Sequence, residues 1–143
     1  MKNVYKQLLV ASICMSSSFV QASNIEFEIA GINSDNGKLY IQIFKGEENY
    51  KQGNAESSSI VNAVKGATKI VFNNMQAGEY AVRFFHDENN NGELETNLFG
   101  MPVEGYGFSN NAKPNFGPVS YSEIKFLVSA NESTVKNRTI AIY

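Results

Sequence analysis

The sequence predicts an all-β protein: a single antiparallel β-sandwich of about seven short strands, either immunoglobulin-like or transthyretin-like. Three observations support this class. Apolar and polar residues alternate with a period of two along most of the chain, which buries one face of each strand. Turn signals recur about every 8 to 15 residues, as in sandwiches of short strands. Beyond residue 22, no window long enough to make a stable helix shows a helical period.

The first expected strand covers Ile25 to Ile29, where isoleucine and phenylalanine alternate with glutamate. Asn36-Gly37 follows, and this pair is a strong hairpin signal because both residues accept positive φ. A second strand is expected from Leu39 to Phe44, so the first two strands should form a hairpin. Its inner face comprises Leu39, Ile41 and Ile43, with Tyr40, Gln42 and Phe44 opposite.

Residues 46–59 are polar and irregular, and one helical turn is expected around Tyr50. Ile60 to Val64 and Lys69 to Phe72 are expected to form a second hairpin around the turn at Lys65-Gly66. The chain therefore contributes two more strands before its most apolar segment.

Ala77-Gly78 turns the chain into that apolar segment, a strand in which Tyr80, Val82 and Phe84 share the inner face and His86 ends the same row. Two final strands are expected near residues 124–128 and 140–142, joined by a turn at Asn131-Glu132.

Residues 1–22 are interpreted as a secretory signal peptide and residues 23–143 as the single folded domain. Lys2 and Lys6 provide a basic start, an apolar stretch runs from Leu8 to Val20, and Val20-Gln21-Ala22 provides the small residues of a cleavage site before Ser23. The alternative, an uncleaved membrane anchor, is disfavoured because the stretch is too short to cross a bilayer of about 30 Å comfortably. We expect an exported protein, periplasmic or extracellular, with no membrane anchor after cleavage.

Charge and cysteine content exclude several functions. Cys14 is the one cysteine, and it lies inside the apolar part of the signal after Ile13, where a lipid-attachment signal requires a small residue. The mature chain would therefore contain neither a disulfide nor a reactive thiol. Ten basic and fourteen acidic residues would remain, a net charge of −4 without a basic cluster. Nucleic acid is not an expected partner.

The segment 98–118 is long for a loop in a compact domain, which is typical of functional loops or Ω-loops. It holds all three prolines, four glycines and four aromatic residues. It is expected to fold back over the end of the sandwich, with Tyr106 or Phe108 near the inner row and His86 hydrogen-bonded beneath. Alternatively, its aromatic side chains, with His86, line a site for a small ligand; the residues considered are Tyr106, Phe108, Phe116 and Phe99.

Oxygen-bearing side chains alternate directly after the apolar strand, a pattern that predicts a calcium-binding loop. Asp87, Asn89 and Asn91 provide side-chain oxygens, Glu93 provides its main-chain carbonyl, and Glu95 is a direct or water-bridged ligand. Neutral asparagines lower the charge, so a weak site is expected, with Kd of about 10⁻⁴–10⁻³ M. The alternative is a set of Asx turns without an ion.

This loop resembles the EF-hand and dockerin calcium loops at their first, third, fifth and sixth positions, the sixth being Gly92. It departs from them at the twelfth position, where Leu98 replaces the bidentate glutamate. Glu104 or the side chain of Asn97 could complete the ligand set.

Four runs carry a resemblance to a protein family: the strand 78–82, the loop 85–92, and the glycine-containing segments 96–102 and 104–112. Together they resemble the small exported bacterial proteins catalogued as domain of unknown function 2141. The resemblance covers the whole mature chain and implies an exported β-domain without an established activity. The Gly-x-Tyr strand is also similar to transthyretin-like and carboxypeptidase-regulatory-like sandwiches.

The expected function is a noncatalytic binding or accessory module with a weak calcium loop, whose partner is a small ligand, a glycan or another exported protein. The alternative is a periplasmic, hydrolase-like enzyme that uses the His86–Asp87 corner for acid–base chemistry. Ser109 lacks the glycine spacing of a nucleophile elbow, so a Ser-His-Asp site has no motif to support it.

Overall fold

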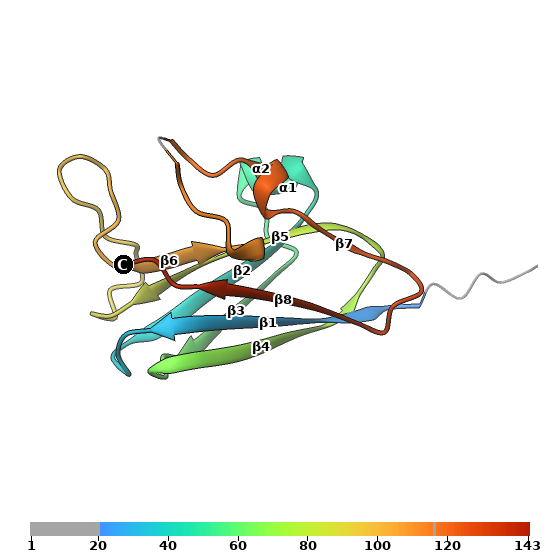
Figure 1. The fold of residues 1–143 in the computed structure, drawn as a ribbon, viewed down its shortest axis with the longest axis horizontal. Helices are drawn as coiled ribbons and strands as arrows, with labels where there is room; N and C mark the ends of the chain where they lie inside the picture. The colour runs from blue at the N-terminus through green and yellow to red at the C-terminus, as the bar shows by residue number, and fades with distance from the viewer. Residues whose placement is uncertain (1–20, 116) are drawn as a thin grey trace, which may run out of the picture.

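The computed structural model describes residues 21–115 and 117–143 of the chain. Eight strands form two sheets on either side of a common core (Figure 1). The predicted all-β sandwich is confirmed, with eight strands where about seven were expected. Most of the expected signal peptide (1–20) and Phe116, a predicted ligand-binding residue, lie outside the described residues. Within the described ranges, no helix is long and apolar enough to span a membrane.

The first sheet has the strand order β4-β1-β8. The central strand β1 (Ser23–Ile32) pairs antiparallel with β4 (Gly66–Met75) and parallel with β8 (Thr134–Ile140). The prediction of a purely antiparallel sandwich is therefore wrong for this one pair. The outer face of this sheet is charged. Oε1 of Glu28 accepts a 2.8 Å hydrogen bond from Nε of Arg138, and the two residues form an ion pair across the parallel strands.

The second sheet has the order β3-β2-β5-β6, and a short strand, β7, pairs with the start of β5. All of its pairings are antiparallel. The strands are β3 (Ser57–Asn62), β2 (Lys38–Lys45), β5 (Gly78–Asp87), β6 (Gly105–Phe108) and β7 (Phe126–Val128).

Neither of the two expected hairpins forms, and the last two strands do not pair with each other either. The Asn36-Gly37 turn carries the chain from β1 in one sheet to β2 in the other, and the same crossing separates β3 from β4 and β7 from β8. Alternation shows which face of a strand is buried, but it carries no information on which strand lies beside it. The two halves of each expected hairpin therefore bury their apolar faces against each other across the core.

The core contains the inner faces that the alternation predicts. Phe27 of β1 contacts Phe84 of β5 edge-to-face across the two sheets, with ring centroids 6.5 Å apart. Burying each such side chain stabilises the fold by about 1.5–3 kcal/mol. The predicted inner residues are buried: Ile25, Phe27, Ile29, Leu39, Ile41, Ile43, Tyr80, Val82, Phe84 and His86.

Short helices cover one end of the outer face of the second sheet. Helix α1 (Glu47–Gln52) contains the helical turn expected around Tyr50. Helix α2 (Tyr121–Ile124) contains Ile124, so the expectation of a strand there is wrong at its first residue. With Ala81 of β5, these helices form a second apolar cluster outside the main core, and this cluster bounds one end of the site described next.

Candidate functional site

The segment 98–118 is more ordered than the expected Ω-loop. It contains β6 and the short helix η1 (Ser109–Asn111), and a bridge between Thr96 and Pro102 closes a small projecting hairpin before them. Because β6 pairs with β5, residues 105–108 extend the sheet edge and do not fold back over the end of the sandwich.

Tyr106 and Phe108 lie on the outer face of the sheet, so the expectation that they approach the inner row is wrong. Tyr106 is paired with Phe85 and Phe108 with Arg83, and paired residues share a face. Glycines occupy the inward positions between them: a Cβ on Gly107 would lie 2.5 Å from a ring atom of Phe84. The core accepts no side chain from β6, so only its outward residues are aromatic.

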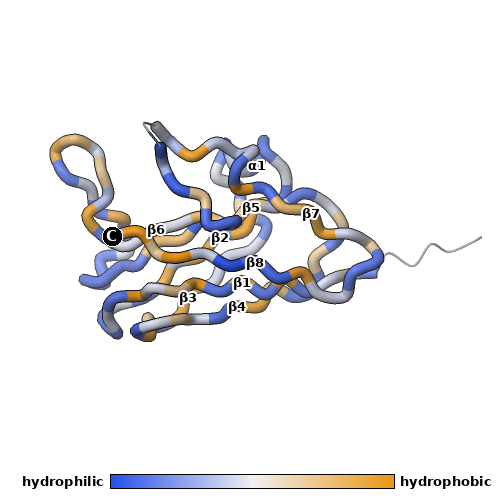
Figure 2. The backbone as a smooth tube through the Cα atoms, in the orientation of Figure 1, coloured by the Kyte–Doolittle hydropathy of each residue, from blue (hydrophilic) through white to orange (hydrophobic). Residues whose placement is uncertain are grey.

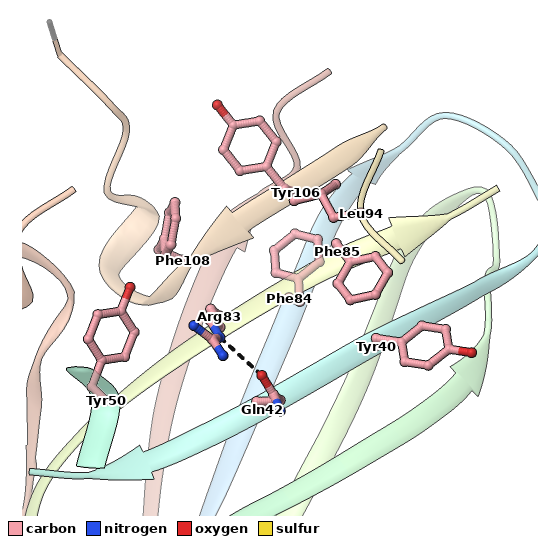
Figure 3. Close-up of a pocket in the computed structure, with 9 residues that line it drawn as sticks. All are labelled: Tyr40, Gln42, Tyr50, Arg83, Phe84, Phe85, Leu94, Tyr106 and Phe108. Carbon is pink, nitrogen blue, oxygen red and sulfur yellow. Dashed lines mark hydrogen bonds between the residues drawn. The ribbon is translucent and has the colours of Figure 1, made fainter. Parts of the chain in front are cut away.

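These outward side chains form an aromatic groove, a hollow of about 420 Å³ on the outer face of the second sheet (Figure 3). Tyr40 and Phe85 stack at 4.9 Å with nearly parallel rings. Of the residues that line the groove, the sequence predicted only Tyr106 and Phe108 as ligand-binding. Tyr40 of β2 and Phe85 of β5 could have been found as well, because both are aromatic residues at outward-facing positions of their strands. The groove is lined by Tyr40, Gln42, Tyr50, Arg83, Phe84, Phe85, Leu94, Tyr106 and Phe108.

Arg83 is the charged group of the aromatic groove. Its Nε donates a 3.0 Å hydrogen bond to Oε1 of Gln42, and its guanidinium lies over the Phe44 ring, 4.7 Å from the centroid. Burial raises the pKa of Tyr50, an effect that the positive charge of Arg83 partly opposes. The Tyr50 hydroxyl therefore stays protonated at neutral pH and can donate a hydrogen bond.

A second hollow of about 570 Å³ adjoins the aromatic groove and shares Tyr50, Tyr106 and Phe108 with it. One wall is the projecting hairpin, whose tip exposes Leu98 and Phe99 almost completely, at 102% and 90%. The apolar tip stands clear of the body of the domain in Figure 2. An exposed apolar surface therefore lies beside the groove.

The polar loop, residues 87–95, brings four of the five predicted metal ligands into one hydrogen-bonded turn. Asp87 accepts hydrogen bonds from the main-chain amides of Asn91 and Gly92 at 3.1 and 2.9 Å. Asn89 accepts a second bond from the Asn91 amide, and Asn91 accepts one from the Glu93 amide. The side-chain oxygens therefore point into the turn.

Glu104, one of the two residues expected to complete the ligand set, closes the polar loop. It is buried, at 4% exposure, and accepts hydrogen bonds from the amides of Glu88 (3.0 Å) and Glu95 (3.2 Å). Glu95, the fifth predicted ligand, accepts a 3.0 Å bond from Nδ2 of Asn91. In the part of the chain that the structure describes, no three His, Cys, Asp or Glu side chains form a metal-binding group. Any ion here would depend on amide and main-chain oxygens.

His86 points inward, as alternation predicts, and is completely buried. Its Nε2 lies 2.7 Å from the Asn36 carbonyl, which can only accept, so Nε2 carries the proton. Its Nδ1 is then free to accept from the Tyr143 hydroxyl at 2.8 Å. Because Tyr106 and Phe108 face the other side of the sheet, the structure does not bring His86 together with them.

Ser109 is buried as well. Its hydroxyl accepts a 2.9 Å hydrogen bond from the Val82 amide and donates to the Ile124 carbonyl. These contacts join the end of β6 to β5 and α2. Ser109 therefore holds the β6 edge of the second sheet against α2.

Fold and site together define a small two-sheet β-domain with an aromatic groove beside an asparagine-rich loop. The chain belongs to the bacterial family described as "Uncharacterized protein conserved in bacteria" (DUF2141), whose model matches residues 27–136. The expected family membership is confirmed. No curated protein and no solved structure shows significant similarity to the chain.

Proposed function

We propose that this protein is an exported, noncatalytic binding module whose polar loop binds calcium weakly and supports one end of the aromatic groove. One observation gives the calcium site its main support. Asp87 and Glu104 are buried carboxylates that accept hydrogen bonds from main-chain amides, and neither has a Lys, Arg or His partner within 4 Å among the described residues. Buried carboxylates are normally paired with a cation or coordinate a metal.

The donor chemistry suits a hard cation. Each oxygen of Asp87 has a lone pair left after accepting one amide, and the amide oxygens of Asn89 and Asn91 are likewise not saturated. Calcium accepts carboxylate, amide and main-chain oxygens in variable numbers, whereas magnesium requires a near-ideal octahedron. The proposed ligands are Asp87, Asn89, Asn91, the Glu93 carbonyl and Glu95, while Glu104 holds the loop through the amides of Glu88 and Glu95.

The loop and the aromatic groove are physically joined through Leu94. This residue lies between Glu93 and Glu95 in the polar loop, and its side chain lines the groove near Phe85 and Tyr106 (Figure 3). An ion that orders the loop would therefore hold one wall of the groove in place. Ion binding thus supports ligand binding without touching the ligand.

Export is supported by the basic start, apolar stretch and small-residue cleavage site of residues 1–22. Strand β1 begins at Ser23, the first residue after the expected cleavage site. Mass spectrometry of the protein secreted by its bacterial host should show Ser23 as the first residue. Retained Met1, or a lipid on Cys14, would contradict export through this signal.

Calcium at 1 mM should raise the melting temperature of residues 23–143 by a few degrees relative to EDTA. With Kd of about 10⁻⁴ M the ion stabilises the fold by roughly 1.4 kcal/mol. For a domain of this size, that is about 3–6 °C. Differential scanning calorimetry in EDTA, calcium and magnesium measures the shift.

Asn89→Ala should abolish the calcium shift, because it removes one ligand at an exposed position. Asn97→Ala is the matched control: Asn97 also accepts two main-chain amides in a turn, but at the tip of the projecting hairpin. It should lower the baseline melting temperature and keep the shift. Identical melting of the unmodified protein in EDTA and calcium would mean that the loop is held by Asx turns alone.

The hydrolase-like alternative has less support from the geometry. Both ring nitrogens of His86 and both carboxylate oxygens of Asp87 are engaged in buried hydrogen bonds within the fold. A general base has to reach the proton that it abstracts from a substrate. The exposed groove, by contrast, offers aromatic surface and one guanidinium, which favours binding.

A further inference from the structure

We propose that the aromatic groove binds small, flat carboxylates, with the carboxylate on Arg83 and the flat body against Tyr106 and Phe108. The inference rests on the proposed role as a binding module and adds the chemical class of the ligand. Two independent features support it: a guanidinium without an anionic partner, and an adjoining apolar surface of matching size.

Arg83 is half-buried and held in place before any ligand arrives. Its Nε is bonded to Gln42, and its plane lies over Phe44, with the Tyr50 ring centroid 5.8 Å away. Among the described residues, no carboxylate lies within 4 Å of it, although the chain is acidic overall. A guanidinium whose Nε is occupied still has four N–H donors, enough to bind both oxygens of a carboxylate.

The groove is asymmetric in a way that would orient such a ligand. Arg83 and Gln42 lie toward the Tyr50 and Phe108 end, whereas Leu94 lies at the opposite end, near Phe85 (Figure 3). The hollow of about 420 Å³ falls in the range of small-ligand sites, which combine apolar walls with a few polar groups. A ligand with one charged end and one flat apolar end can bind the polar groups at one end of the groove and the apolar walls at the other.

The polar groups at the charged end also select against bulky anions without an apolar body. Tyr50 stays protonated and can donate a second hydrogen bond beside Arg83, because burial raises its pKa. The remaining lining is aromatic or aliphatic and offers little to hydrate a large polar body. An inorganic anion would contact only the polar groups around Arg83 and would gain nothing from the apolar walls.

The test compares trans-cinnamate with its neutral analogue cinnamamide on residues 23–143, by NMR titration in EDTA. We expect cinnamate to shift the amide signals of Arg83, Tyr106 and Phe108 and to bind at least 10-fold more tightly than cinnamamide. Arg83→Gln should remove this preference and leave the weaker cinnamamide affinity unchanged. Arg138→Gln is the control, because Arg138 is paired with Glu28 on the opposite sheet.

Tyr106→Ala should weaken both probes, since it removes an aromatic ring from the apolar wall that both probes would contact. If Arg83→Gln does not fold, the preference of the unmodified protein for cinnamate over cinnamamide still decides the question. Equal affinity for the two probes, or no shift in the groove with either, would overturn the assignment of ligand class. In EDTA no calcium is bound, so a shift in the groove reports the probe alone, and the calcium site is tested separately by titrating calcium without a probe.

Discussion

Gly37→Ala should lower the free energy of unfolding by roughly 2–5 kcal/mol. Gly37 has a φ of +69°, and a Cβ there would lie 1.8 Å from the main-chain oxygen of Asp87. The left-handed conformation alone costs a residue with a Cβ about 1–2 kcal/mol, and forcing an atom into packed surroundings typically adds about 1–3 kcal/mol. Urea unfolding followed by circular dichroism measures the change.

Gly46→Ala is the matched control for this prediction. Gly46 has a similar φ of +81°, but a Cβ there would meet nothing within 4 Å. Gly46→Ala should therefore lower the free energy of unfolding only by the cost of the left-handed conformation, about 1–2 kcal/mol. If both variants lose the same stability, the close contact between Gly37 and Asp87 does not exist in solution.

His86→Leu should also cost about 1–3 kcal/mol. Leucine keeps most of the buried volume, but it leaves the Asn36 carbonyl without the partner that it has at 2.7 Å, and it removes one of two partners of the half-exposed Tyr143 hydroxyl, which keeps the Asn33 amide. Each buried polar group left unpaired costs about 1–3 kcal/mol. Urea unfolding of the variant gives the loss.

Tyr143→Phe separates the two hydrogen bonds of His86. It removes one partner and should cost about 1 kcal/mol alone. The double variant should be more stable than the sum of the single losses predicts, because both single variants break the same His86–Tyr143 hydrogen bond. Strict additivity would show that His86 and Tyr143 are not coupled, contrary to the structure.

The sequence predicts which face of each strand is buried, but it does not predict which strands lie side by side in a sheet. Alternation identified the inner residues of β1, β2 and β5, because burial on one side leaves a local pattern. The parallel pairing of β1 with β8 joins segments about a hundred residues apart and leaves no such pattern. Asn36-Gly37 is correctly predicted as a turn. A turn that joins two sheets requires the same positive φ as a hairpin turn, so the turn residues do not tell whether the flanking strands pair.

The candidate site was predictable to the same extent. The polar loop is contiguous, so its spacing showed where Asp87, Asn89 and Asn91 would converge. The aromatic groove combines residues from α1, β2, β5, β6 and the loop, and its central charge, Arg83, is an ordinary outward position in its own strand. Gly107 concealed the orientation of β6, because a glycine facing the core removes the alternation that marks a strand.

The most direct test of the calcium-supported binding module is a calcium titration of ¹⁵N-labelled residues 23–143, followed by NMR. The account predicts saturable shifts at the amides of residues 87–95, with a midpoint of about 0.1–1 mM. It also predicts smaller shifts at Leu94 and its groove neighbours Phe85 and Tyr106. Amides of the polar loop that do not move up to 10 mM calcium, roughly ten times the upper end of that affinity range, would contradict it.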